Sequence, residues 1–143
     1  DVSNVTNMAN MFRCDYGSLL FNQPLSSWDV SSVTNMQEMF KQSAFNQDIS
    51  GWDVSSVTNM SRMFENNSIF NQPLNAWISA NVTNMSYMFS AATAFNQPLN
   101  NWDVSSVTNM SQMFYRAYLF NQPLNSWDVS AVTNMQNMFH YVG

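Results

Sequence analysis

The sequence predicts an α/β-type solenoid in which each repeat forms one coil with a short parallel β-strand and a short helical or 3₁₀ segment. The five tryptophans stand at positions 28, 52, 77, 102 and 127, so that they are 24, 25, 25 and 25 residues apart. A constant period of this size is typical of repeat architectures. The dipeptide Asn-Met recurs in the same register six times, and all insertions fall in one interval of the repeat. We therefore expect residues 1–143 to form one domain of about five to six coils.

The first half of the repeat predicts a turn followed by a strand. In the copy "FNQPLSSWDV", proline fixes its own φ and pushes the preceding residue toward extended backbone, which favours a turn before Leu25. The apolar residues Leu25, Trp28 and Val30 are separated by polar ones. We expect a short strand at about 27–30 with its apolar side chains inward.

The second half of the repeat, "SSVTNMQEMF", predicts the helical segment. Val33, Met36 and Met39 follow one another at intervals of three, and Phe40 comes next. This spacing indicates a helical or 3₁₀ segment on the flank opposite the strand. The insertions, such as "RCDYGSLL" after Phe12, come directly after it and are expected to be surface loops.

The pattern L-x-x-W-x-V-x-x-V-x-x-M-x-x-M-F, from Leu25 to Phe40, resembles the leucine-rich repeats of BspA-type surface proteins. The copy "FNQPLNSWDVSAVTNMQNMF" is similar to the 25-residue variety in mycoplasma-type surface lipoproteins. The resemblance covers essentially the whole chain and implies a right-handed, leucine-rich-repeat-like coil at a cell surface. Because neither end looks like a polar cap, we expect either stacking on further copies or a segment of a longer repeat array.

Composition excludes several classes of function. Only 9% of the residues are charged and the net charge is -5, whereas nucleic acids and anionic membrane surfaces require clustered Lys and Arg. No apolar run approaches the length needed to cross a bilayer, so direct membrane insertion is not expected. The single histidine, His140, lies far along the chain from the single cysteine, Cys14, and no phosphate-binding glycine loop occurs. We expect no enzyme, no cofactor and no metal site.

The apolar ladders are expected to form the core, since equivalent residues of adjacent coils lie on top of one another. The expected core residues are Trp28, Trp52, Trp77, Trp102, Trp127, Met36, Met60, Met85, Met110 and Met135. The recurring asparagines are expected to form hydrogen-bonded ladders. Among the N-x-S/T sequences only Asn66, in a variable loop, is a plausible glycosylation acceptor.

A row of threonines precedes the six Asn-Met dipeptides. Their hydroxyls are expected to cap backbone N–H groups at the entry to the helical segment. A flat threonine row can also bind ice, which remains a remote alternative.

A polar row on the outward side of the predicted strand is the candidate binding face, called the Asp–Ser face below. Its residues are Ser27, Asp29, Ser31, Asp53, Ser55, Ile78, Asp103, Ser105, Asp128 and Ser130. Ile78 and Ser79 break the pattern in "WISANVTNM", where we expect a looser strand or a shifted register. The carboxylates could be held by neighbouring Ser hydroxyls and backbone N–H groups, or they could bind a ligand.

Two functions follow from these observations. The first is an extracellular or cell-surface module that recognises a protein or glycan through the Asp–Ser face. The alternative is a structural fibre or surface-layer component, in which the partner is another copy of the chain and uncapped coils assemble end to end.

Overall fold

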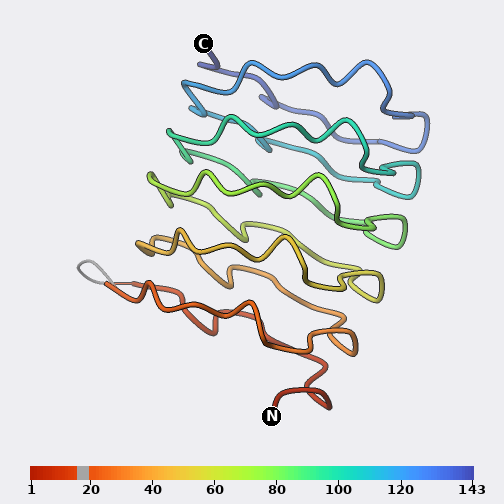
Figure 1. Ribbon diagram of the computed structural model, residues 1–143. Coiled ribbons are helices and arrows are strands. Elements are labelled where there is room, and N and C mark those ends of the chain that lie inside the picture. The colour runs from red at the N-terminus through yellow and green to blue at the C-terminus, as the bar shows by residue number, and fades with distance from the viewer. Residues whose placement is uncertain (16–19) are drawn as a thin grey trace.

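The computed structural model describes residues 1–15 and 20–143. The chain winds through successive layers that lie one on another, with the N-terminus at one end of the stack and the C-terminus at the other (Figure 1). Each layer is one copy of the repeat. Backbone hydrogen bonds join every layer to the next, for example from Met60 N–H to the carbonyl of Asn84 at 3.0 Å.

The predicted α/β-type solenoid, with a strand and a helical segment in each repeat, is wrong. No helix and no strand of two or more residues occurs in the described parts of the chain. The layers meet instead at isolated parallel bridges between the asparagines of successive Asn-Met dipeptides. These bridges join Asn7 to Asn35, Asn35 to Asn59, Asn59 to Asn84, Asn84 to Asn109, and Asn109 to Asn134.

The physical reason is that each layer is a series of tight turns. In one layer, hydrogen bonds run from Trp28 N–H to the carbonyl of Leu25, from Val33 to Val30, and from Met39 to Met36. A β-turn joins residue i to residue i+3, which is also the spacing of apolar residues along a helix face. In the turns Leu25–Trp28 and Val30–Val33, the first and last residues are buried or partly buried, and the two polar residues between them form the corner. Apolar spacing alone therefore could not distinguish these turns from a helix.

Residues with a positive φ, in the left-handed region of backbone conformation, allow the turns to follow one another closely. Glu38 has φ 56° and is the third residue of the Met36–Met39 turn, where a positive φ is the mark of type II geometry. Eleven non-glycine residues of the described chain have positive φ: Asn10, Glu38, Gln42, Arg62, Asn66, Tyr87, Ala91, Gln112, Arg116, Asn137 and Tyr141. An L-residue is strained in this region, so stacking between layers must compensate at each position.

Ala91→Gly is expected to stabilise the protein by about 0.5–1 kcal/mol, because glycine adopts the observed φ of 55° without steric strain. Ala94→Gly is the control, since Ala94 does not have a positive φ and the change only adds freedom to the unfolded chain. Denaturant melts of the two variants should move in opposite directions. A loss of stability in both would contradict the strain at residue 91.

Phenylalanines form two interlocked columns through the core. In one column, Phe64, Phe89 and Phe114 stack with ring centroids 5.6 and 5.7 Å apart. Within each layer the two columns touch, as in the stacked pair Phe89 and Phe95 at 4.0 Å. All eleven phenylalanines of the sequence take part in such stacks.

The other expected core residues differ between the middle and the ends of the stack. Trp52, Trp77 and Trp102 are buried, and so are Met36, Met60, Met85 and Met110. Trp28 and Trp127 are only partly buried. Met135, in the last layer of the sequence, is 41% exposed.

Polar side chains tie the layers together. The indole Nε1 of Trp102 donates to the Leu74 carbonyl of the preceding layer at 2.8 Å, and the equivalent bond recurs at Trp52, Trp77 and Trp127. The Oδ1 of Asn71 accepts from the backbone N–H of Asn96 at 3.0 Å in a column that continues through neighbouring layers. No buried side-chain nitrogen or oxygen in the described residues lacks a partner.

Candidate ligand-binding face

The acidic row of the Asp–Ser face is built from a small turn that recurs in four layers. The Oδ1 of Asp53 accepts from the backbone N–H of Ser55 at 3.0 Å, and Asp103 and Ser105 repeat the contact. Asp29 and Asp128 are bonded to Ser31 and Ser130 in the same way. Side-chain oxygens of Asp readily form such bonds two residues along the chain. The four carboxylates are exposed, and so is Asp1, which is bonded to Ser3 at the start of the row.

Hydrogen bonds hold these carboxylates in the ionised state. The side-chain and backbone bonds from Ser55 lower the pKa of Asp53, and those from Ser105 lower the pKa of Asp103. For Asp29 the bonds from Ser31 lower the pKa, and the charge of Asp53 opposes them. The bonds from Ser130 likewise lower the pKa of Asp128 against the charge of Asp103. The row therefore remains negatively charged at neutral pH.

The protein is expected to lose stability as the pH falls below about 4, the ordinary Asp value. A folded-state pKa below the unfolded value means that the aspartates stabilise the fold fully above that pH, and that this contribution is lost as the pH falls through the folded pKa. The acid midpoint can be followed by tryptophan fluorescence. Replacing Asp29, Asp53, Asp103 and Asp128 by Asn, which keeps the acceptor oxygen, should flatten the dependence; an unchanged profile would contradict the role of these bonds.

Six other charged residues form a separate ionic cluster that is electrically neutral. The Nζ of Lys41 lies 3.0 Å from Oε2 of Glu65, which also accepts from Arg62 at 3.0 Å. Members of the cluster are Arg13, Asp15, Glu38, Lys41, Arg62 and Glu65. The cluster was not predicted, although two pairs of opposite charge stand one repeat apart in the sequence, Glu38 with Arg62 and Lys41 with Glu65.

The net charge of -5 is therefore carried mainly by the Asp–Ser face. Outside the cluster the sequence has one cation, Arg116, against Asp48 and the five carboxylates of the row. No described Lys or Arg forms an ion pair with a carboxylate of the row. A surface with uncompensated negative charge attracts ligands that carry positive groups.

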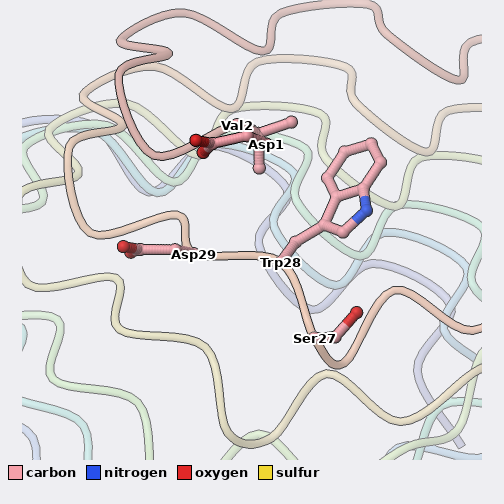
Figure 2. A pocket seen from close by; sticks show the side chains of 5 residues that line it. All are labelled: Asp1, Val2, Ser27, Trp28 and Asp29. Carbon is pink, nitrogen blue, oxygen red and sulfur yellow. The ribbon is translucent and has the colours of Figure 1, made fainter.

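Two shallow depressions lie along the face. One, of about 280 Å³, is lined by Asp1, Val2, Ser27, Trp28 and Asp29. Figure 2 shows the carboxylates of Asp1 and Asp29 extending in the same direction, whereas the Trp28 ring points the other way. The other, of about 260 Å³, includes Asp53 and Ser55 on one layer and Ile78 on the next.

Ile78 changes the chemistry of the face without disturbing the stack. Its side chain is 64% exposed at the place where other layers carry Asp. Ser79 is buried in the place of a core valine, and its Oγ donates to the Asp103 carbonyl at 2.9 Å. Of the two alternatives expected for this layer, the shifted register does not occur, because the bridges from Asn59 to Asn84 and from Asn84 to Asn109 continue through it. The looser strand does not apply, since the described residues contain no strand of two or more residues.

The threonine row does not cap N–H groups as the sequence predicted. The hydroxyl of Thr83 donates to the carbonyl of Thr58 in the preceding layer at 3.2 Å, and Thr34, Thr58, Thr108 and Thr133 repeat this bond. The prediction was that a backbone N–H donates to the threonine hydroxyl. Instead the hydroxyl is the donor, and a backbone carbonyl is the acceptor. The hydroxyl protons are thus engaged within the stack.

The other candidate groups lie apart from the Asp–Ser face. Asn66 is exposed at a turn corner with φ 57°, beside a depression of about 170 Å³ that also includes Ile69. Cys14 is buried near the N-terminal end of the stack, and His140 is exposed in the last layer. No three acidic, His or Cys side chains of the described residues are placed to hold a metal ion. A search of the same residues finds no helix able to span a membrane.

Comparison with known families gives one match. The family described as "Mycoplasma protein of unknown function, DUF285" matches residues 1–80 and 43–142, which together cover nearly the whole chain. Neither a curated protein nor a solved structure matches the chain significantly.

Proposed function

Because the chain belongs to the family of Mycoplasma proteins of unknown function termed DUF285, we propose that it is a non-enzymatic cell-surface module that binds a protein or glycan ligand through its Asp–Ser face. The family, and the resemblance of the repeat to those of BspA-type surface proteins, support the extracellular location. The observation that carries the proposal is a row of exposed carboxylates without paired cations on a stack of regularly spaced layers.

The chemistry of the face favours a ligand with positively charged groups. The Oδ1 of each row aspartate is engaged by a serine N–H two residues along the chain, and the carboxylate remains exposed. Ile78 adds an apolar contact between the Asp53 and Asp103 layers. Lys or Arg side chains of a protein partner fit this arrangement better than anionic sugars do, since like charges repel across an interface.

The proposal is tested with arrays of glycans and of lysine- and arginine-containing peptides, probed with the purified chain. Asp53→Asn and Asp103→Asn keep the acceptor for the serine N–H but remove the charge, so the fold should be retained. Each change is expected to weaken binding roughly three- to fivefold at low salt, as one surface ion pair would.

Asp48→Asn is the matched control. Asp48 is bonded to Ser50 in the same manner and its pKa is also lowered by the backbone and side-chain bonds of that serine, but it does not belong to the row. This variant should bind as the unmodified chain does. Equal binding by the Asp53→Asn and Asp103→Asn variants, or an equal loss in Asp48→Asn, would refute the assignment of the face.

A further inference from the structure

Three departures from the repeat meet at one depression on the Asp–Ser face. This depression, called the Gly51 depression below, has a volume of about 260 Å³ and includes Asp53, Ser55 and Ile78 among its lining residues. Gly51 and Ala76 line it as well. Ile78 stands where the other layers carry Asp, and Gly51 and Ala76 stand at equivalent corners of two successive layers. The residues at this corner in other layers are Ser27, Asn101 and Ser126.

The two layers that form the Gly51 depression are internal. Asn59 and Asn84 belong to these layers and are bridged to each other. Asn59 is also bridged to Asn35 in the preceding layer, and Asn84 to Asn109 in the following one. The shape of the depression is therefore set by its own side chains, with a described layer on either side of it.

Missing side chains create the open space. A Cβ atom added to Gly51 would meet no heavy atom within 4 Å, and the φ of Gly51 is not in the left-handed region that favours glycine. The backbone therefore does not require glycine at this corner. Ala76 is exposed at the equivalent corner of the next layer and adds only a methyl group. A serine or asparagine at these corners would occupy part of the space.

The two layers contribute different chemistry to the depression. The first contributes the carboxylate of Asp53, which is exposed and forms no ion pair with a described Lys or Arg. The second contributes the side chain of Ile78, which is 64% exposed. A carboxylate beside an accessible apolar side chain matches a ligand group with a cationic head and an apolar stem, as in lysine and arginine. The depression is several times larger than the about 30 Å³ that a water molecule occupies, so one long side chain can enter it.

The contacts of Asp53 favour lysine over arginine. Its Oδ1 already accepts the backbone N–H of Ser55 at 3.0 Å. A guanidinium pairs best with a carboxylate when both oxygens accept from its planar fork, so it would compete with Ser55. An ammonium is a compact charge and needs only the second oxygen, Oδ2.

We propose that the Gly51 depression binds the side chain of one lysine of a protein ligand, with the ammonium on Oδ2 of Asp53 and the methylene stem against Ile78. This contact rests on the function proposed above, as one anchor within the Asp–Ser face. Asp103 also neighbours the Ile78 layer, but Asn101 occupies the corner beside it. A side chain that fills a depression can carry a large share of the binding energy of an interface.

The probe is a capped Gly-Gly-Lys-Gly-Gly peptide, titrated into the ¹⁵N-labelled chain and followed by amide chemical shifts. Shifts are expected at residues 50–55 and 76–78, with a Kd in the millimolar range, because a single surface contact is weak. The same peptide with arginine in place of lysine should bind at least about threefold more weakly, since it cannot use both carboxylate oxygens. A peptide with alanine at that position should leave these residues unshifted.

Two variants change the depression without changing the charge of the face. Gly51→Asn fills the open corner with the side chain that Asn101 has at the equivalent place, and Ile78→Ser removes the apolar wall. Each should weaken binding of the lysine peptide at least about threefold, because the methylene stem loses its apolar contact or its space. Ser126→Asn is the control, since it places the same side chain on the equivalent corner three layers away. This variant should bind the lysine peptide as the unmodified chain does.

Unchanged binding in Gly51→Asn and Ile78→Ser, with shifts spread along the whole row, would overturn the lysine anchor and leave the Asp–Ser face supported. An arginine peptide that binds as tightly as the lysine peptide would overturn the choice of lysine. The absence of any shift with the lysine peptide overturns the anchor too. The function proposed for the face is decided separately, by whether Asp103→Asn, which lies outside the depression, loses binding to the arrays.

Discussion

Phe89→Ala is expected to lower the free energy of unfolding by about 3–5 kcal/mol, the usual loss for a fully buried phenylalanine. Phe89 is 0% exposed and stacks on Phe64, Phe95 and Phe114. Removing it leaves a cavity in its own column beside Phe95 of the other, and because each layer is held by its neighbours, the layers on either side lose packing as well. Urea or guanidinium melts followed by tryptophan fluorescence give the loss directly.

Phe139→Ala is the matched control in the same column. Phe139 is 52% exposed in the last layer, and Phe114 is its one stacking partner among the described residues. Its loss of stability is expected to be about 1 kcal/mol or less. Equal losses for the two variants would contradict the division between internal and end layers.

Trp102→Ala is expected to cost a similar 3–5 kcal/mol, since the side chain is only 3% exposed. It also removes the hydrogen bond from Nε1 to the Leu74 carbonyl and the stacked contact with Trp77 at 6.2 Å between ring centroids. Thermal and chemical denaturation of this variant give the size of the combined loss.

Trp102→Phe separates the two contributions. Phenylalanine keeps most of the apolar contact but cannot donate to the carbonyl, which retains its bond from Trp77 N–H. A loss of about 1–2 kcal/mol is expected, between that of alanine and no change. If Trp102→Ala melted like the unmodified chain, the indole would not be part of the core.

Much of the candidate site could be predicted from local sequence, because its contacts span only two residues. The pattern Asp-x-Ser places the serine N–H within reach of the carboxylate in each layer. The threonine contacts could not be predicted in the same way, since their acceptor is a carbonyl 24, 25 or 28 residues away. The ionic cluster was overlooked for the same reason, although opposite charges one repeat apart were a usable signal.

The sequence by itself determined the period, the single interval that accepts insertions, and which side chains alternate between inside and outside. These properties follow from repetition, because every layer must present the same apolar shape to the next. Only the tertiary structure decided the backbone conformation. Interlayer hydrogen bonds and phenylalanine stacking hold residues such as Glu38 and Ala91 at positive φ, which neither residue favours alone. Turns stacked in this way bury apolar residues at positions i and i+3, as a helix would. Only the contacts between layers favour the turns over the helix.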